Sequence, residues 1–311
     1  MRAATTKKVR IPQRVAITAL LMGAMLPEPG AAQDSRERLL VSAEWLVAHI
    51  DDPGVVVIQP QSRGYAQGHI PGARQVPSRA VTYNEGDEAS PDHKMLELPP
   101  DLEQVRGALE QAGVSDGSHV VITFEGRGMA WATRLLWTSQ VLGLTHVSLL
   151  DGGNAAWEEA GGVLVTEVPP SGRGSVTSPP DLSRRVDKGL VRRVSEGAAA
   201  GYALLDARAP ASYDGVEEER PGRAGHIPGA ENVPMTRIFD ERGRLRSPRE
   251  LKALFDGAGV ASGDQIVAYC HIGLWATTLV FAARTLGYEA VLYDGSMSEW
   301  ARDSSLPLVR R

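Results

Sequence analysis

The sequence predicts an α/β fold in two tandem copies, each a parallel sheet flanked by helices on both faces. Three observations predict this fold. The hexapeptide GHIPGA occurs twice, at Gly68–Ala73 and Gly225–Ala230. Other blocks repeat in the same order around it. Within each copy, short apolar segments alternate with segments of helical spacing, and this alternation is typical of parallel sheets covered by helices.

The repeated blocks align the two copies residue by residue. An apolar run precedes each GHIPGA and a Val-Pro pair follows it, while AGVSDGSHVVITF matches AGVASGDQIVAYC and LLDGGNAAW matches LYDGSMSEW. These matches pair Phe124 with Cys270, Asp151 with Asp294, and Trp157 with Trp300. We interpret the repeated tryptophans as core residues.

A stretch rich in Pro, Gly and Ser, PPSGRGSVTSPP at residues 169–180, separates the copies and is typical of a linker. We therefore expect a first domain over residues 36–168, a linker over 169–182 and a second domain over 183–311.

The second copy illustrates the expected order of elements. A short strand at 203–208 comes first, followed by a helix at 247–260 that Ser247 can cap and that Gly257 and Gly259 end. An apolar strand at 264–270 leads into a helix at 274–288, and a final short strand covers 289–294.

Residues 1–32 have the pattern of an export signal. A positive start is followed by the uncharged, mostly apolar run Val15–Leu26 and then by small residues in LPEPGAAQ. The run is shorter than the roughly 20 residues that span a bilayer. We expect a periplasmic or secreted protein, soluble after cleavage near Gln33; the alternative is a basic leader that stays attached. A net charge of -5 gives no reason to expect nucleic acid or an anionic membrane as a partner.

Cys270 is the only cysteine in the chain, which excludes an internal disulfide and a zinc site built from several cysteines. We expect no metal or cofactor. Cys270 lies where a strand runs into a helix, so the loop amides and the helix N-terminus can point at its sulfur. Gly273 supplies backbone freedom for this turn. Such a cradle is expected to lower the pKa of the thiol and to suit double-displacement chemistry, although a buried cysteine at the end of a core strand fits the same pattern.

The tandem copies, the repeated GHIPGA, the single cysteine in the second copy and the closing YDGSMSEW resemble the rhodaneses. These are two-domain sulfurtransferases of the thiosulfate and 3-mercaptopyruvate type. The resemblance implies a silent first domain, in keeping with Phe124 at the cysteine position. It also implies that Cys270 takes the outer sulfur of a small anionic donor as a persulfide. That sulfur then passes to a thiophilic acceptor such as cyanide or a thiol. We expect a monomer.

The resemblance also supplies candidate substrate-binding residues. Arg208, just after the first strand of the second copy, matches an arginine that reaches the donor anion; a surface arginine is the alternative. His93 resembles a histidine that mercaptopyruvate enzymes contribute from the first domain. The loop residues expected to contact the donor are His271, Ile272, Gly273, Leu274, Trp275 and Ala276. His271 and Ile272 depart from the residues that usually follow the cysteine, so the identity of the donor stays open.

His69 and His226 belong to the GHIPGA blocks of both copies, so we predict turn-fixing hydrogen bonds for them rather than a role in the reaction. Phosphatases and arsenate reductases of the same fold need an arginine six residues after the cysteine. That position is Ala276, which disfavours them. A sulfur-carrying or anion-binding module without turnover would use the same Cys270 loop and stays open.

Overall fold

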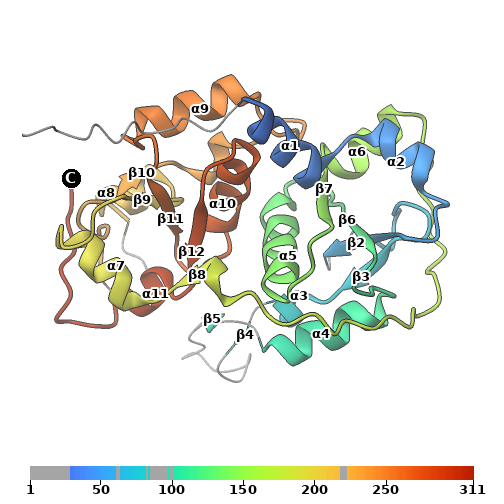
Figure 1. The fold of residues 1–311 in the computed structure, drawn as a ribbon, viewed down its shortest axis with the longest axis horizontal. Helices are drawn as coiled ribbons and strands as arrows, with labels where there is room; N and C mark the ends of the chain where they lie inside the picture. Colours follow the sequence, from blue (N-terminus) through green and yellow to red (C-terminus); the bar gives the residue numbers. More distant parts are fainter. Residues whose placement is uncertain (1–28, 61–63, 82, 85–96, 99–100, 218–222) are drawn as a thin grey trace, which may run out of the picture.

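Figure 1 shows the fold in a computed structural model of the chain. The structure describes residues 29–60, 64–81, 83–84, 97–98, 101–217 and 223–311. The expected export signal lies outside these ranges except for residues 29–32. His93 also lies outside them, and so does Gln61, the counterpart of Arg208 in the first copy.

The first repeat forms a five-stranded, all-parallel sheet. Its strands, in spatial order, are β1 Leu40–Val41, β7 Val147–Leu150, β6 His119–Ile122, β2 Val55–Pro60 and β3 Arg74–Val76. Its helices are α1 Pro29–Leu39, α2 Ala43–His49, α3 Ser78–Val81, α4 Leu102–Gln111, α5 Met129–Val141 and α6 Gly153–Glu159. A separate antiparallel pair joins β4 Tyr83–Asn84 to β5 Glu97–Leu98.

The second repeat forms the same kind of sheet, also all-parallel. Its strands, in spatial order, are β10 Glu231–Asn232, β9 Tyr202–Asp206, β11 Gln265–Tyr269, β12 Ala290–Tyr293 and β8 Arg185–Val186. Its helices are α7 Lys188–Ser195, α8 Pro210–Asp214, α9 Pro248–Gly257, α10 Ala276–Thr285 and α11 Ser296–Trp300, with single 3₁₀ turns at Leu182–Arg184 and Met235–Arg237.

Both faces of each sheet are covered by helices, as predicted. One face of each sheet packs into a single apolar core shared by the two repeats, which includes Leu135 of α5 and Leu279 of α10. The outer face of the first sheet packs against α2 and α6 around Trp157, and that of the second packs against α7 and α11 around Trp300. Both tryptophans are buried core residues, which confirms their predicted role.

The element ends follow the local signals in the sequence. Ser247 caps α9 by accepting from the Glu250 amide, and the Glu250 side chain accepts from the Ser247 amide in return. The expected helix at 274–288 is α10, which begins at Ala276 and is followed by Gly287 at φ 80°. The expected strand at 264–270 is β11, so Cys270 is the first residue beyond the strand.

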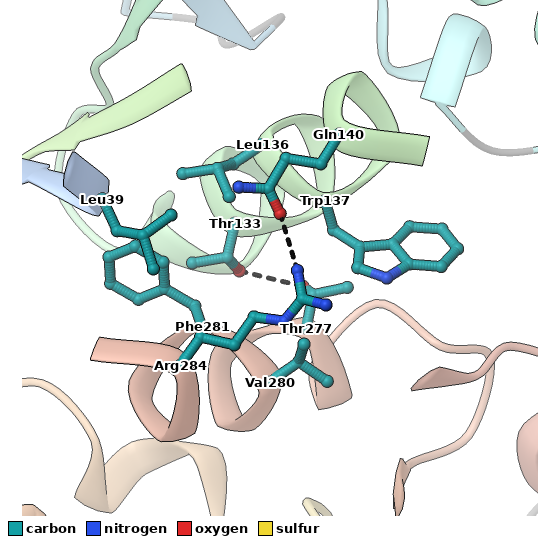
Figure 2. A pocket seen from close by; sticks show the side chains of 9 residues that line it. All are labelled: Leu39, Thr133, Leu136, Trp137, Gln140, Thr277, Val280, Phe281 and Arg284. Atoms are coloured by element: carbon teal, nitrogen blue, oxygen red, sulfur yellow. Dashed lines mark hydrogen bonds between the residues drawn. The ribbon is translucent and has the colours of Figure 1, made fainter. Parts of the chain in front are cut away.

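Helices α5 and α10 lie side by side at the junction of the repeats (Figure 1). Thr133 Oγ1 and Thr277 Oγ1 share a hydrogen bond of 2.9 Å, and Arg284 Nη1 donates to Gln140 Oε1 at 3.0 Å (Figure 2). Each pair is 144 residues apart, so the helices run in the same direction. The cavity between them has a volume of about 10 Å³, room for no more than one water molecule.

Candidate active site

Cys270 lies at the carboxyl end of the central strand β11, and the loop from His271 to Trp275 carries the chain into α10. Its side chain is buried, and it forms no disulfide. The predicted strand–turn–helix placement of the thiol is therefore confirmed. Ligands of open parallel sheets bind at the carboxyl ends of the strands, so this loop is the candidate active site.

The turn after β12 holds the main chain of Cys270 in place. The Cys270 amide donates to Ser296 Oγ at 3.2 Å, and the Cys270 carbonyl accepts from the Met297 amide at 3.0 Å. The Ser298 amide donates to the His271 carbonyl at 2.8 Å. Ser296 has a φ of 50°, the one non-glycine residue with positive φ in the described part of the chain. Such backbone strain persists only where surrounding contacts enforce it. Here the strained residue is the one whose hydroxyl oxygen accepts from the Cys270 amide.

Two opposing influences set the pKa of the Cys270 thiol. Burial raises it, and the nearby carboxylate of Asp206 raises it further. The amides of Ile272, Ala276 and Trp275 donate toward the sulfur and lower it. The net direction is upward, so the predicted lowering of the pKa was wrong. The three amides are present, but burial raises the pKa of the thiol by more than their hydrogen bonds lower it.

Gly273 is required by both conformation and space. Its φ is 79°, a value that L-residues rarely adopt, and a Cβ atom there would lie 2.2 Å from Asp294 Oδ1. The sequence indicated that Gly273 frees the turn. The structure adds that the neighbour which approaches it is a carboxylate of the protein itself.

The other loop residues divide into buried and outward-facing ones. Leu274 and Ala276 are buried, whereas His271 and Ile272 are half-buried and Trp275 is 37 % exposed. The rings of His271 and Trp275 meet edge to face, with centroids 5.7 Å apart. An aromatic pair therefore stands on the solvent side of the loop.

Arg208 is buried and hydrogen-bonded within the protein. Its side chain is 1 % exposed, and Nε and Nη2 donate to the carboxylate of Asp206 at 2.7 to 3.0 Å. Nη2 also donates to the Gly225 carbonyl at 2.8 Å. The alternative of a surface arginine is wrong. This geometry favours a role in joining the strand end to the GHIPGA turn, and it offers no support for the predicted contact with the donor anion.

The two GHIPGA histidines have matching environments. His69 Nδ1 hydrogen-bonds the Tyr65 carbonyl at 2.8 Å, and His226 Nδ1 hydrogen-bonds the Tyr213 carbonyl at 2.7 Å. Each imidazole also stacks on the ring of the same tyrosine, with centroids 3.8 and 3.7 Å apart. Their predicted turn-fixing role is confirmed.

The first repeat fills the position of the thiol with an aromatic ring. Phe124 is 3 % exposed, and Cβ atoms placed at Gly153 and Gly243 would lie 3.1 and 3.0 Å from its ring. Gly243 belongs to the second repeat, so this repeat helps to enclose the loop of the first. The neighbouring Glu125 side chain accepts from the Gly64 amide at 2.8 Å.

Sequence reasoning missed an ion pair between the repeats. Arg134 of α5 donates to both carboxylate oxygens of Asp294, at 2.5 and 3.2 Å. The repeat alignment singled out Asp294 and its counterpart Asp151, but nothing in the sequence pointed to the distant arginine. Among the described residues, no three His, Cys, Asp or Glu side chains are grouped so that they could hold a metal ion.

Comparisons with known proteins agree with this architecture. A model of the rhodanese-like domain matches residues 42–160 and 181–303. The 3-mercaptopyruvate sulfurtransferase of Escherichia coli K12 is 34 % identical over 86 % of this chain and 96 % of its own length. A putative thiosulfate sulfurtransferase, SseB of Mycobacterium tuberculosis H37Rv, is 32 % identical over 79 % of this chain and 84 % of its own length.

Two further similarities extend the comparison. The sulfur carrier protein TtuD of Thermus thermophilus is 30 % identical over 88 % of this chain and 96 % of its own length. The crystal structure of SseA from Escherichia coli, described as a 3-mercaptopyruvate sulfotransferase with a rhodanese fold, superposes with a TM-score of 0.71 at 30 % identity. That superposition covers 83 % of this chain and 98 % of SseA.

Proposed function

This chain belongs to the rhodanese-like family and is a sulfurtransferase, and from that premise we propose that Cys270 carries the transferred sulfur. One observation carries the proposal. The single thiol of the chain lies at the carboxyl end of a central strand, with three loop amides donating toward it. Backbone N–H groups fixed around a sulfur stabilise the negative charge of a thiolate or persulfide without any movement during the reaction.

The proposed reaction has two displacements on sulfur. The Cys270 thiolate attacks the outer sulfur of thiosulfate, the S–S bond of the donor breaks, and sulfite leaves with the bonding pair. The product is a Cys270 persulfide anion within reach of the amides of Ile272, Trp275 and Ala276. A nucleophile such as cyanide then attacks the outer sulfur, thiocyanate leaves, and the Cys270 thiolate is restored. Charge and atoms balance in each step, and no cofactor takes part.

Thiosulfate is the donor that we propose, with 3-mercaptopyruvate as its rival. The support is His271, a group able to carry positive charge beside the persulfide, and the absence of an aspartate shortly after the first GHIPGA, where the sequence is QVPSRAV. Relatives named for each donor have nearly the same identity to this chain. Side-by-side measurement of kcat/KM for both donors tests the choice, and a larger value for 3-mercaptopyruvate would reverse it.

Intact-mass analysis tests the role of Cys270 itself. Incubation with the correct donor should add one sulfur atom to the wild-type protein, and cyanide should remove it. Cys270→Ser replaces the thiol by a hydroxyl of similar size, so the variant should fold normally and gain no sulfur. A sulfur adduct on the folded serine variant would contradict the mechanism.

A carrier without turnover is a second candidate, favoured by the similarity to a sulfur carrier protein. Both functions load Cys270, so loading does not separate them. Multiple turnover does: an enzyme should release many equivalents of thiocyanate from thiosulfate and cyanide, or of pyruvate from 3-mercaptopyruvate. A folded, reduced protein that stops after one equivalent with every donor would be a carrier.

We propose also that residues 1–32 are removed on export and that the mature protein is a monomer in the periplasm or outside the cell. The support is the charged start and the apolar run Val15–Leu26. Within the described residues, no helix is long and apolar enough to span a membrane. The mass of the protein recovered from the cell exterior or periplasm should correspond to a chain beginning near Gln33. Recovery of the full chain from the cytosol would contradict export, and a dimer mass in sedimentation would contradict the monomer.

A further inference from the structure

A buried ion pair joins the two repeats directly behind the Cys270 loop. Arg134 of α5 is fully buried, and Asp294, which follows β12, is 3 % exposed. Nη1 and Nη2 of the arginine each donate to one carboxylate oxygen, at 2.5 and 3.2 Å. Two parallel bonds between a planar guanidinium and a carboxylate fix direction as well as distance. The position of the Asp294 carboxylate is therefore set by a residue of the other repeat.

Arg134 is itself anchored in the first repeat. Its Nε donates to the Val81 carbonyl at 3.0 Å, and its guanidinium carbon lies 4.9 Å from the ring centroid of Trp137. Each of its three side-chain nitrogens thus donates a hydrogen bond inside the protein. These contacts orient the Arg134 guanidinium toward Asp294.

Asp294 transmits this anchoring to the cysteine loop. A Cβ atom at Gly273 would lie 2.2 Å from Asp294 Oδ1 and 3.2 Å from Arg134 Nη1, so the ion pair packs against the middle of the loop. Two residues beyond Asp294, the Ser296 hydroxyl oxygen accepts from the Cys270 amide. The same turn therefore contacts the loop at both Gly273 and Cys270.

We infer that Arg134 is a positioning residue for the Cys270 loop: through Asp294 it fixes Gly273 and keeps the loop amides directed at the sulfur. This inference rests on the sulfur-transfer role proposed for Cys270. It gives the repeat without a thiol a part in the reaction, because the repeat supplies the rigid partner that the loop needs. A displacement of about 1 Å in a catalytic group can slow a reaction about a hundredfold.

The equivalent site in the first repeat is built differently. The WAT triplet at residues 131–133 matches the WAT triplet at 275–277, which places Thr278 of α10 at the position of Arg134. Asp151, the counterpart of Asp294, accepts instead from the backbone amide of Leu245 at 2.7 Å. The aspartate that pairs with an arginine is thus the one beside the thiol-bearing loop. A role in positioning that loop requires this arrangement.

The substitution Arg134→Lys tests the inference, because lysine keeps the charge and loses the two parallel bonds. Arg284→Lys is the matched control, because it makes the same change at the same helix interface, where Arg284 donates to Gln140 (Figure 2). Arg284 lies in the last turn of α10, whereas the Cys270 loop precedes the first turn. The readouts are the rate at which iodoacetamide alkylates Cys270 as a function of pH, the rate of sulfur loading from thiosulfate, and the melting temperature. Asp206, the carboxylate that acts on the thiol, is unchanged in both variants.

Arg134→Lys should slow loading by about tenfold to a hundredfold and should move the alkylation profile to higher pH, because misdirected amides no longer favour the thiolate. Arg284→Lys should lower the melting temperature and leave the profile at its wild-type position. A wild-type profile in Arg134→Lys would overturn the inference, whatever the loss of stability.

If Arg134→Lys does not fold, the double variant Arg134→Met with Asp294→Asn removes both buried charges and permits the same measurement. A shifted profile in the folded double variant supports the inference, and an unshifted one overturns it. Wild-type protein that is alkylated but never loads sulfur would contradict the proposed function. The alkylation profile tests the positioning role of Arg134 whether or not the protein loads sulfur.

Discussion

The carboxylate of Asp294 touches the backbone of Gly273 so closely that a Cβ atom at Gly273 would lie 2.2 Å from Asp294 Oδ1. Gly273 also has a φ of 79°. A glycine with positive φ is common in turns, but here the contact adds a second requirement. The turn that carries the candidate nucleophile is shaped against a buried ion pair between the repeats, so loop conformation and repeat packing depend on each other.

Gly273→Ala should therefore destabilise the protein by more than its backbone strain. Strain alone at a left-handed position costs about 1–2 kcal/mol, and displacement of Asp294 from Arg134 adds to it. Gly263→Ala is the control, since Gly263 has a φ of 89° with no atom within 4 Å of a Cβ. Urea unfolding and sulfur loading measure both variants. Equal stability losses with normal loading in both would show that the contact with Asp294 is unimportant.

The fold was predictable because duplication and periodicity are visible in the chain itself. Two copies of GHIPGA and the alternating apolar runs define both parallel sheets, and Ser247 with Glu250 marks a helix start that the structure confirms. The position of Cys270 at a strand end followed from the same pattern. These features depend on residues that are close in sequence, so the sequence carries them directly.

The electrostatics and long-range contacts of the site were not predictable in this way. The pKa of Cys270 depends on how completely the fold removes it from water, and spacing along the chain does not give that quantity. Arg134 reaches Asp294 across 160 residues and a repeat boundary. The resemblance suggested that Arg208 reaches the donor anion, and it gave no sign that Arg208 Nε and Nη2 donate to the carboxylate of Asp206, two residues away.

Installing a thiol in the first repeat should not create a second active site. In Phe124→Cys combined with Cys270→Ser, intact mass should show no added sulfur. Glu125 directly follows the new thiol in the sequence and adds a negative charge to this loop, which disfavours a thiolate and repels an anionic donor. Loss of the buried ring should also cost about 3 kcal/mol, as for other large-to-small core changes. A cyanide-removable sulfur on this variant would show that the silent loop lacks only the cysteine.

Sulfur loading should depend strongly on pH. Burial raises the pKa of the Cys270 thiol, and only the thiolate is a nucleophile. The loading rate should therefore rise about tenfold per pH unit as pH increases toward the ordinary thiol pKa of about 8.5, and should continue to rise beyond it. Stopped-flow or quenched loading between pH 6 and about 10 would record the profile. A plateau already reached at neutral pH would show that the amide cradle outweighs burial.

Removing Arg208 should affect stability more than donor binding. Arg208→Met leaves the buried carboxylate of Asp206 without its partner, and breaking a buried pair in this way costs about 3–5 kcal/mol. Arg208→Met with Asp206→Asn should recover part of that loss because no unpaired charge remains. Chemical unfolding and the KM for thiosulfate separate the two roles. A tenfold or larger rise in KM with unchanged stability would restore the anion-clamp interpretation.

Acid should destabilise the first repeat through His119, whose pKa is lowered by burial and by the charges of His146 and His49. The unfolded chain, with a histidine pKa near 6.5, then binds the proton more readily than the folded protein. The favourable contribution of neutral His119 is complete above that pH and is lost as pH falls below it, toward the lower folded pKa. The melting temperature should accordingly drop between pH 7.5 and about 5. The two variants below locate the acid sensitivity.

His119→Gln should reduce this drop, because no proton binds at the position in either state. His146→Gln should reduce it partly, because it removes one of the charges that lower the pKa of His119. An unchanged drop in both variants would place the acid sensitivity elsewhere in the protein.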